Sequence, residues 1–206
     1  MKKITFIFLL INFVFISCDK DEEVVSVPVV SDQVVNLAAP QTGGQGQPIG
    51  GAFTKFDFAS GSETTSETDW DIAFRGTTIA VNGGVATGTA DEPTRNGTAG
   101  ATISTGTFAG IVSAEGLSFD QDSTDGFAIP TGSGNGWYNY NSQAFTISPI
   151  PGKIIVIQTR NGNYAKMEIL SYYQNQPENP DPFSDLSRYY SFNYLYNPNV
   201  GEFSLE

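Results

Sequence analysis

The sequence contains no histidine and a single cysteine, Cys18, among its 206 residues. Without an imidazole to act as general base, Ser/His/Asp and Cys/His catalysis are excluded. Ordinary zinc sites are excluded as well, because they are built from histidine and cysteine ligands. No glycine-rich stretch has the spacing of a phosphate-binding loop followed by a helix. We therefore predict that the protein is not an enzyme.

Basic residues are also scarce. The chain has 10 Lys and Arg against 22 Asp and Glu, so its formal net charge is −12. Nothing in such a chain offsets the repulsion of phosphate groups, and nucleic acid and anionic lipid are poor partners.

The first residues have the order of a signal peptide. Residues 1–3 are short and basic, residues 4–16 are almost wholly apolar, and Ser17 precedes Cys18. The apolar run is shorter than the roughly 20 residues that span a bilayer. Its end resembles a bacterial lipobox, in which the cysteine is acylated and becomes the mature N-terminus. This accounts for a lone cysteine that has no disulfide partner in the chain; the alternative is a leftover cysteine in an uncleaved or fully removed leader.

The residues that follow predict location and tethering. The acidic run 19–23 looks like the export signals that send some lipoproteins of didermal bacteria to the outer face of the outer membrane. Residues 24–51 mix Val-Pro pairs with Gly, Gln and Pro, which is typical of an extended linker. We predict a signal peptide at 1–17, a lipidated N-terminus and flexible tether at 18–50, and one domain at 51–206, with the lipid anchor as the only membrane contact.

The clearest local structure is a β-hairpin at residues 153–160 and 163–173, around Asn161-Gly162. A two-residue type I′ turn at this dipeptide places Val156 opposite Met167. Lys166 and Glu168 then point to the other face. The residues expected on the core face are Ile154, Val156, Ala165, Met167 and Ile169.

The rest of the chain also reads as strands. Apolar or alternating runs predict them at 53–58, 70–75, 77–82, 101–105 and 189–196, with shorter candidates at 107–113 and 127–130. In residues 70–75 the polar side chains Asp71 and Arg75 are expected on an outer side. No stretch outside the leader keeps helical spacing, and 22 glycines separate the apolar pieces. The prediction is an all-β single domain with long Gly-rich loops.

Two acidic patches have a functional and a plain interpretation. Asp69 and Asp71 flank Trp70 and have the residue types of a glycosidase acid and base, although exposed acids at this spacing are usually solvated. Asp120, Asp122 and Asp125 hint at a calcium loop, but the glycine lies at the wrong offset, so we interpret them as an acidic turn.

Residues 134–140 form a glycine-rich loop that carries three aromatic residues: Trp137, Tyr138 and Tyr140. Aromatic side chains on a loop favour the binding of a flat apolar ligand or a sugar. Packing over the edge of the sheet is the alternative.

Several of these segments together resemble the HmuY family, in matching order and spacing over most of the mature chain. They are the lipobox, Trp70-Asp71-Ile72-Ala73-Phe74-Arg75, Gly136-Trp137-Tyr138-Asn139-Tyr140, the hairpin from Ile147-Ser148-Pro149 to Met167, and Arg188-Tyr189-Tyr190-Ser191-Phe192. The resemblance implies an all-β outer-membrane or shed lipoprotein that takes haem from host carriers and passes it to a TonB-dependent outer-membrane receptor.

The sequence departs from this family at the iron. Family members grip haem iron with two histidines or, in some relatives, two methionines, and many carry a histidine just before the Ile-x-Pro segment, where this chain has Phe145. After loss of Met1 with the leader, Met167 is the only methionine and is one candidate iron ligand, although the predicted register turns it into the core. The aromatic loop and the resemblance together suggest Tyr138 or Tyr140, as tyrosinate, as the alternative iron ligand.

The same resemblance gives the other expected roles at a haem site. Trp137 stacks on the porphyrin, and Lys153, Arg160 or Lys166 meets the propionates. The competing hypothesis is a lipoprotein that kept the fold, lost haem ligation, and recognises another porphyrin, a glycan or a protein.

Overall fold

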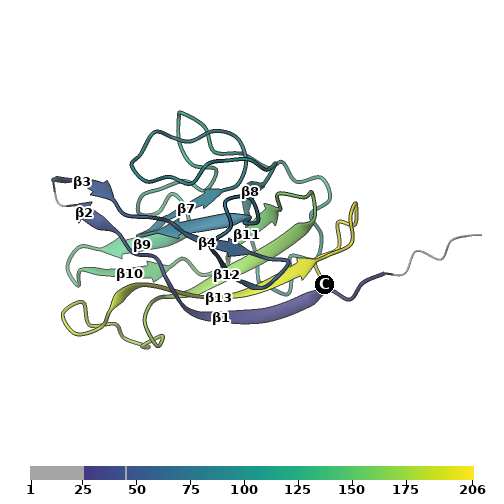
Figure 1. The fold of residues 1–206 in the computed structure, drawn as a ribbon. Coiled ribbons are helices and arrows are strands. Elements are labelled where there is room, and N and C mark those ends of the chain that lie inside the picture. Colours follow the sequence, from purple (N-terminus) through teal and green to yellow (C-terminus); the bar gives the residue numbers. More distant parts are fainter. Residues whose placement is uncertain (1–25, 45) are drawn as a thin grey trace, which may run out of the picture.

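The computed structural model describes residues 26–44 and 46–206 (Figure 1). The predicted signal peptide, Cys18 and the acidic run lie outside the described residues. Those residues contain thirteen strands and no helix, which confirms the all-β prediction. Accordingly, no helix within residues 26–44 and 46–206 is long and apolar enough to cross a membrane.

The larger sheet has five antiparallel strands. Their order across the sheet is β1 (Val30–Ala38), β13 (Ser187–Asn197), β12 (Tyr164–Tyr173), β11 (Lys153–Gln158) and β8 (Gly100–Thr105). β13 is an interior strand next to the edge strand β1, and it pairs with β1 on one side and β12 on the other. As predicted, its residues Tyr190, Phe192, Tyr194 and Tyr196 all belong to the main core.

A smaller sheet lies over this one (Figure 1). Its order is β5 (Ser62–Thr64), β4 (Thr54–Asp57), β6 (Ile72–Arg75) and β7 (Thr78–Val81). Aromatic side chains close the space between the two sheets. The ring centroids of Phe56 and Phe192 are 5.4 Å apart, and those of Phe74 and Tyr190 are 4.8 Å apart. The main core is therefore the interior of a two-sheet sandwich.

The register of the central hairpin differs from our prediction by one residue. Met167 pairs with Ile155, and Lys166 pairs with Val156. The Gly162 amide donates to the Thr159 carbonyl at 3.0 Å, and of the two turn residues only Gly162 has a positive φ, +83°. These features define a three-residue loop with a glycine bulge in place of the type I′ turn. Because a slip of one residue exchanges faces, Ile155 and Ile157 face the main core and Val156 faces away.

The outer face of the larger sheet is also buried. A second cluster joins Val156, Tyr164 and Leu195 to Leu205 near the C-terminus, and loop residues such as Phe108 and Ile111 pack against it. Lys166 is only 2% exposed there. Its Nζ donates to the Phe108 and Ile111 carbonyls at 2.7 and 2.8 Å. This covering explains why β11 is apolar on both faces.

Part of the predicted tether is wrong. Within residues 18–50, β1 pairs with β13 along the edge of the larger sheet, and Leu37 is 2% exposed. β2 (Thr42–Gly44) and β3 (Gln47–Gly50) form a hairpin beyond it. The Val-rich run thus belongs to the domain, because pairing with β13 satisfies its backbone and buries Leu37.

Most other predicted strands are confirmed, at 53–58, 70–75, 77–82 and 101–105. The segments 107–113 and 127–130 form no strand, and their only β pairing is an isolated bridge from Ser113 to Ser204, so those two predictions were wrong. The polar outer side expected for residues 70–75 was also wrong, since Asp71 and Arg75 are 1% and 2% exposed. Both side chains lie under other parts of the chain.

The buried tyrosines predict a loss of stability at high pH. Burial raises the pKa of Tyr172, Tyr190, Tyr194 and Tyr196 above 10.0. A raised pKa means that the folded state binds the phenol proton more tightly than the unfolded state. The resulting contribution to stability is complete below the pKa of the unfolded state, and it is lost as the pH rises from there through the pKa of the folded state. Lys166 acts in the opposite direction, because burial lowers its pKa, but four phenols outweigh one amine. We expect the urea midpoint to fall between pH 9 and about pH 11.

Tyr190→Phe is the control for this profile. Tyr190 is fully buried and its hydroxyl donates to the Gly76 carbonyl at 2.9 Å. The variant is less stable at neutral pH, but its stability falls less steeply with pH. A midpoint that stays constant up to about pH 11 contradicts the prediction.

Candidate functional site

A two-stranded hairpin extends from one end of the sandwich (Figure 1). β9 (Tyr138–Asn141) pairs with β10 (Thr146–Pro149), with Tyr138 opposite Pro149 and Tyr140 opposite Ile147. The Asn141 carboxamide oxygen accepts the amides of Gln143 and Ala144 at 2.9 and 3.1 Å and so organises the tip. The Ile147 amide donates to the Tyr173 hydroxyl at 3.0 Å, which ties the hairpin to β12.

The base of this hairpin is packed into the core. Trp137 is 2% exposed, and its Nε1 donates to the Thr77 carbonyl at 3.0 Å. Its ring centroid lies 4.9 Å from Tyr138, 5.8 Å from Tyr172 and 5.1 Å from Tyr190. Trp137 and Tyr138 therefore form a buried aromatic layer under the hairpin, which we call the floor of the hairpin. For these two residues the structure agrees with packing, the alternative to ligand binding that the sequence analysis left open.

The outer part of the hairpin is exposed. Tyr140 and Phe145 are 45% and 59% exposed. Phe145 also has a φ of +57°, a backbone conformation that is unfavourable for a bulky side chain. Such strain of about 1–3 kcal/mol persists only where the surroundings enforce it, and it concentrates at functional sites. A large aromatic side chain is thus held in solvent by a strained turn.

A second exposed segment lies at the same end of the sandwich. Residues 174–186 connect β12 to β13, and the Gln174 amide donates to the Leu186 carbonyl at 2.9 Å. Phe183 and Leu186 are 89% and 58% exposed. We call the four exposed side chains on these two segments, Tyr140, Phe145, Phe183 and Leu186, the aromatic end. Figure 1 shows the β9–β10 hairpin and this connection at the side opposite the C-terminus.

Backbone strain concentrates around the aromatic end. The described residues include six non-glycine residues with positive φ, and five of them lie on this side. The Asn175 amide donates to the Asn36 carboxamide oxygen at 2.7 Å, which holds two of them together. The five are Asn36, Phe145, Asn175, Gln176 and Arg188.

Arg188 lies at the start of β13, directly after the 174–186 connection. It is half-buried, and its Nη1 donates to the Gln41 carbonyl at 2.7 Å. Burial raises the pKa of Tyr172, and the positive charge of Arg188 nearby acts to lower it. The aromatic end thus has a positive group at its base in a strongly acidic chain.

The acidic patches do not form catalytic or calcium sites. Asp71 is buried and pairs with Arg160 at 3.1 Å, whereas Asp69 is exposed and bonded to Ser66. Asp122 pairs with Arg95 at 2.8 Å, and burial raises its pKa. Within the described ranges, no group of three acidic side chains is arranged to hold a metal ion.

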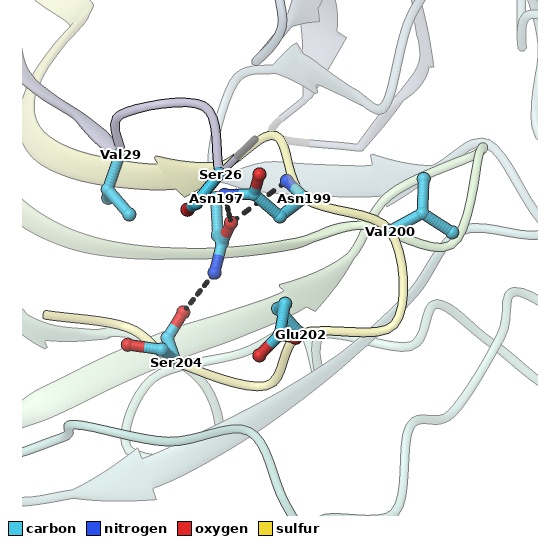
Figure 2. Close-up of a pocket in the computed structure, with 7 residues that line it drawn as sticks. All are labelled: Ser26, Val29, Asn197, Asn199, Val200, Glu202 and Ser204. Carbon is cyan, nitrogen blue, oxygen red and sulfur yellow. Dashed lines mark hydrogen bonds between the residues drawn. The ribbon is translucent and has the colours of Figure 1, made fainter. Parts of the chain in front are cut away.

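A hollow of about 530 Å³ lies at the other end of β13, as Figure 2 shows. The carboxamide oxygen of Asn197 accepts the Asn199 amide at 2.9 Å, and its nitrogen donates to the Ser204 carbonyl at 3.0 Å. No aromatic residue lines this hollow. It does not offer a surface for a flat apolar ligand.

Residues 51–194 match the family described as HmuY protein. The chain belongs to the HmuY family.

The fold agrees with this membership. An apo HmuY analog from Tannerella forsythia is 10% identical, and the match covers 85% of this chain and 100% of that one with a TM-score of 0.50. The chain also matches a candidate HmuY-like haem-binding protein from Bacteroides vulgatus, with 12% identity, coverage of 85% of this chain and 98% of that one, and a TM-score of 0.48. A third match is a candidate lipoprotein from Bacteroides fragilis, with 11% identity, coverage of 85% of this chain and 96% of that one, and a TM-score of 0.46. No curated protein sequence matched the chain.

The pair of axial ligands implied by the HmuY resemblance does not fit this chain. Met167 is 0% exposed inside the sandwich, and Tyr138 is packed against Trp137. Of the proposed iron ligands, only Tyr140 presents an accessible side chain. The predicted ligands therefore do not offer a pair of accessible side chains on one surface.

Two of the cations expected at the propionates are engaged elsewhere. Arg160 pairs with Asp57 and Asp71, and Lys166 is buried on the outer face of the larger sheet. Lys153 is half-buried on β11, opposite Thr105. The structure instead places Arg188 near the HmuY aromatic end, a residue that the sequence analysis did not assign. The long Pro- and Asn-rich connection at residues 174–186, which precedes Arg188, could have pointed to this residue, because loops of this length are often functional.

Proposed function

We propose that this HmuY-family protein is a lipid-anchored cell-surface lipoprotein that binds haem at the aromatic end and passes it to a TonB-dependent outer-membrane receptor. The observation that carries the proposal is the exposed pair Tyr140 and Phe145 on a strained hairpin tip in a family of haem-binding proteins. Acylation of Cys18 supplies the anchor.

The chemistry of binding follows from the exposed groups. Phe145 and Phe183 offer apolar faces on which a flat macrocycle stacks. The Tyr140 hydroxyl offers one axial oxygen to a ferric ion, and tyrosine is an established haem ligand. Arg188 is positioned to attract a carboxylate once its bond to the Gln41 carbonyl is exchanged.

We expect haemin to bind more tightly than metal-free protoporphyrin IX, because only haemin uses the Tyr140 oxygen. Tyr140→Phe should weaken haemin binding about tenfold, or about 1.4 kcal/mol, and leave protoporphyrin binding unchanged. Phe145→Ala should weaken both ligands about three- to tenfold through lost stacking. Absorbance titration of the wild-type protein and both variants with each ligand measures these affinities.

Phe203→Ala is the matched control, since Phe203 is 41% exposed beyond the opposite end of β13. It should leave both affinities unchanged. A second candidate function is a lipoprotein that binds porphyrin without an axial iron ligand. If the wild-type protein and Tyr140→Phe both bind haemin and protoporphyrin with equal affinity, this second function is correct and iron ligation is not. That candidate is favoured by the burial of Met167 and Tyr138. Absence of saturable binding of either ligand contradicts both.

A further inference from the structure

A separate cavity of about 570 Å³ lies between the β2–β3 hairpin, the β6–β7 turn and the loops around Ala90 and Phe127. This volume is within the range of small-molecule sites. Its polar lining consists of Gln41, Arg75 and four threonines, and its apolar lining comes from Ile49, Phe127 and Ala90. None of Tyr140, Phe145, Phe183 and Leu186 lines it, and the cavity adjoins the proposed haem surface only through Gln41, whose carbonyl accepts from Arg188.

Arg75 is the only charged residue in this lining, and it is 2% exposed. Its Nη1 donates to the carbonyl of Gly51 at 3.3 Å and to that of Ala90, and its Nη2 donates to the Thr89 hydroxyl at 2.9 Å. Its guanidinium carbon lies 4.2 Å from the centroid of the Phe53 ring. These contacts hold the plane of the guanidinium in one orientation.

The guanidinium retains unused donors. An arginine has five N–H groups, and the contacts above use three of them. Nε has no hydrogen-bond partner although it is buried, and Nη2 has one N–H left. Nε and Nη2 can present parallel N–H groups, the arrangement that binds a carboxylate with two hydrogen bonds.

The charge of Arg75 also lacks a direct partner. Among the described residues, every carboxylate in ion-pair contact pairs with another base. Glu92 reaches Arg75 only through the Thr89 hydroxyl and is paired with Arg95 at 2.6 Å, and Asp91 accepts the Gly51 amide. Burial lowers the pKa of Arg75, although the negative charges of Glu92 and Asp91 act to raise it. A buried cation without a carboxylate partner is costly unless a ligand supplies one.

We propose that this cavity binds a small hydroxylated carboxylate, of the size and chemistry of an acidic monosaccharide. The carboxylate meets the free N–H of Nη2 of Arg75 and, after a side-chain shift that uncovers the buried Nε, the N–H of Nε. The ligand hydroxyls meet Thr78, Thr131 and Gln41, and the apolar face of the ring lies against Phe127. The chain would thus recognise a sugar acid as well as the ligand of its aromatic end.

Titration of the ¹⁵N-labelled protein with D-glucuronate, followed by amide chemical shifts, tests this site. D-glucose is the control that keeps the ring hydroxyls and lacks the charge. We expect saturable shifts around Arg75, Thr78 and Thr131 with glucuronate, and at least about tenfold weaker binding of glucose, because hydrogen bonds to charged groups contribute more than neutral ones. No saturable shift with glucuronate, or equal affinity for both sugars, overturns the proposal.

Two variants distinguish a loss of ligand binding in the cavity from a loss of folding. Arg75→Lys keeps the charge and removes the two-pronged contact, so it should abolish the preference for glucuronate over glucose. Thr78→Val leaves Arg75 in place and should weaken both sugars about two- to tenfold. If Arg75→Lys does not fold, Thr78→Val still decides, since unchanged affinity for glucuronate in this folded variant contradicts the assignment of the cavity.

Discussion

Replacing Arg160 with alanine is expected to lower the free energy of unfolding by about 3–5 kcal/mol, the usual cost of removing one partner of a buried ion pair. The Arg160 side chain is 13% exposed and lies 2.6 Å from Asp57 and 3.1 Å from Asp71. Its backbone amide also donates to Asp71 at 3.0 Å. The residue sits in the β11–β12 loop, so it joins the larger sheet to the smaller one. Urea unfolding at neutral pH measures the loss.

The physical reason is the pair of carboxylates that remains. Burial acts to raise the pKa of Asp57, but hydrogen bonds from Arg160 and Ser60 outweigh it and hold the pKa below its usual value. Burial raises the pKa of Asp71, against the opposing amides of Arg160 and Phe58. Without Arg160, two acids face each other with little water between them.

A second substitution provides the control. Combining Asp57→Asn with Arg160→Ala removes one of the two remaining charges, so the double variant should lose less stability than the sum of the two single variants. Additive losses, or a loss below about 1 kcal/mol for Arg160→Ala alone, would mean that the pair behaves as an exposed surface ion pair.

The sequence predicted strands well where one face differs from the other. In β13, Tyr190, Phe192, Tyr194 and Tyr196 alternate with smaller or polar residues, and the predicted face is the observed core face. In β11, residues 154–157 are all apolar because the sheet is covered on both sides. A strand that is apolar on both faces does not indicate which of its residues face the core, so the hydrophobic pattern of β11 could not fix the register of the hairpin. The dipeptide Asn161-Gly162 could not fix it either, because it fits both a two-residue and a three-residue loop.

Partners distant in the sequence explain the other errors. Asp71 appeared to be exposed because it alternates with Trp70 and Ile72, but its partner Arg160 is 89 residues away. Likewise, β1 has the composition of a linker, and only its pairing with the C-terminal strand β13 makes it part of the domain. Local pattern does not contain contacts of this kind.

The candidate site was predicted in part. The aromatic loop was identified from its composition, but composition does not separate the side chains that pack beneath the hairpin from those at its tip. Pairing within the hairpin decides this, since Trp137 and Tyr138 lie at its base and Tyr140 and Phe145 lie toward its tip. Residues 174–186 were missed because only the fold brings them to the same end.

Trp137→Ala is expected to reduce the free energy of unfolding by about 3–5 kcal/mol, the cost of truncating a large buried aromatic side chain. Removal of the ring leaves a cavity among Tyr138, Tyr172 and Tyr190, and it leaves the Thr77 carbonyl without its donor. Trp137→Phe keeps much of the volume and should lose about 1–3 kcal/mol, mainly through the unpaired carbonyl. Urea unfolding followed by far-UV circular dichroism gives both values.

Phe145→Ala is the matched control in the same hairpin, because Phe145 is an exposed aromatic residue. We expect its stability to change by about 0.5 kcal/mol or less, whereas its affinity for porphyrin falls. The two substitutions should therefore affect different quantities: Trp137→Ala lowers the free energy of unfolding, and Phe145→Ala lowers the affinity for porphyrin. A stable Trp137→Ala variant with impaired haemin binding would reverse these roles and place the ligand against the floor of the hairpin, where Trp137 was first expected to stack.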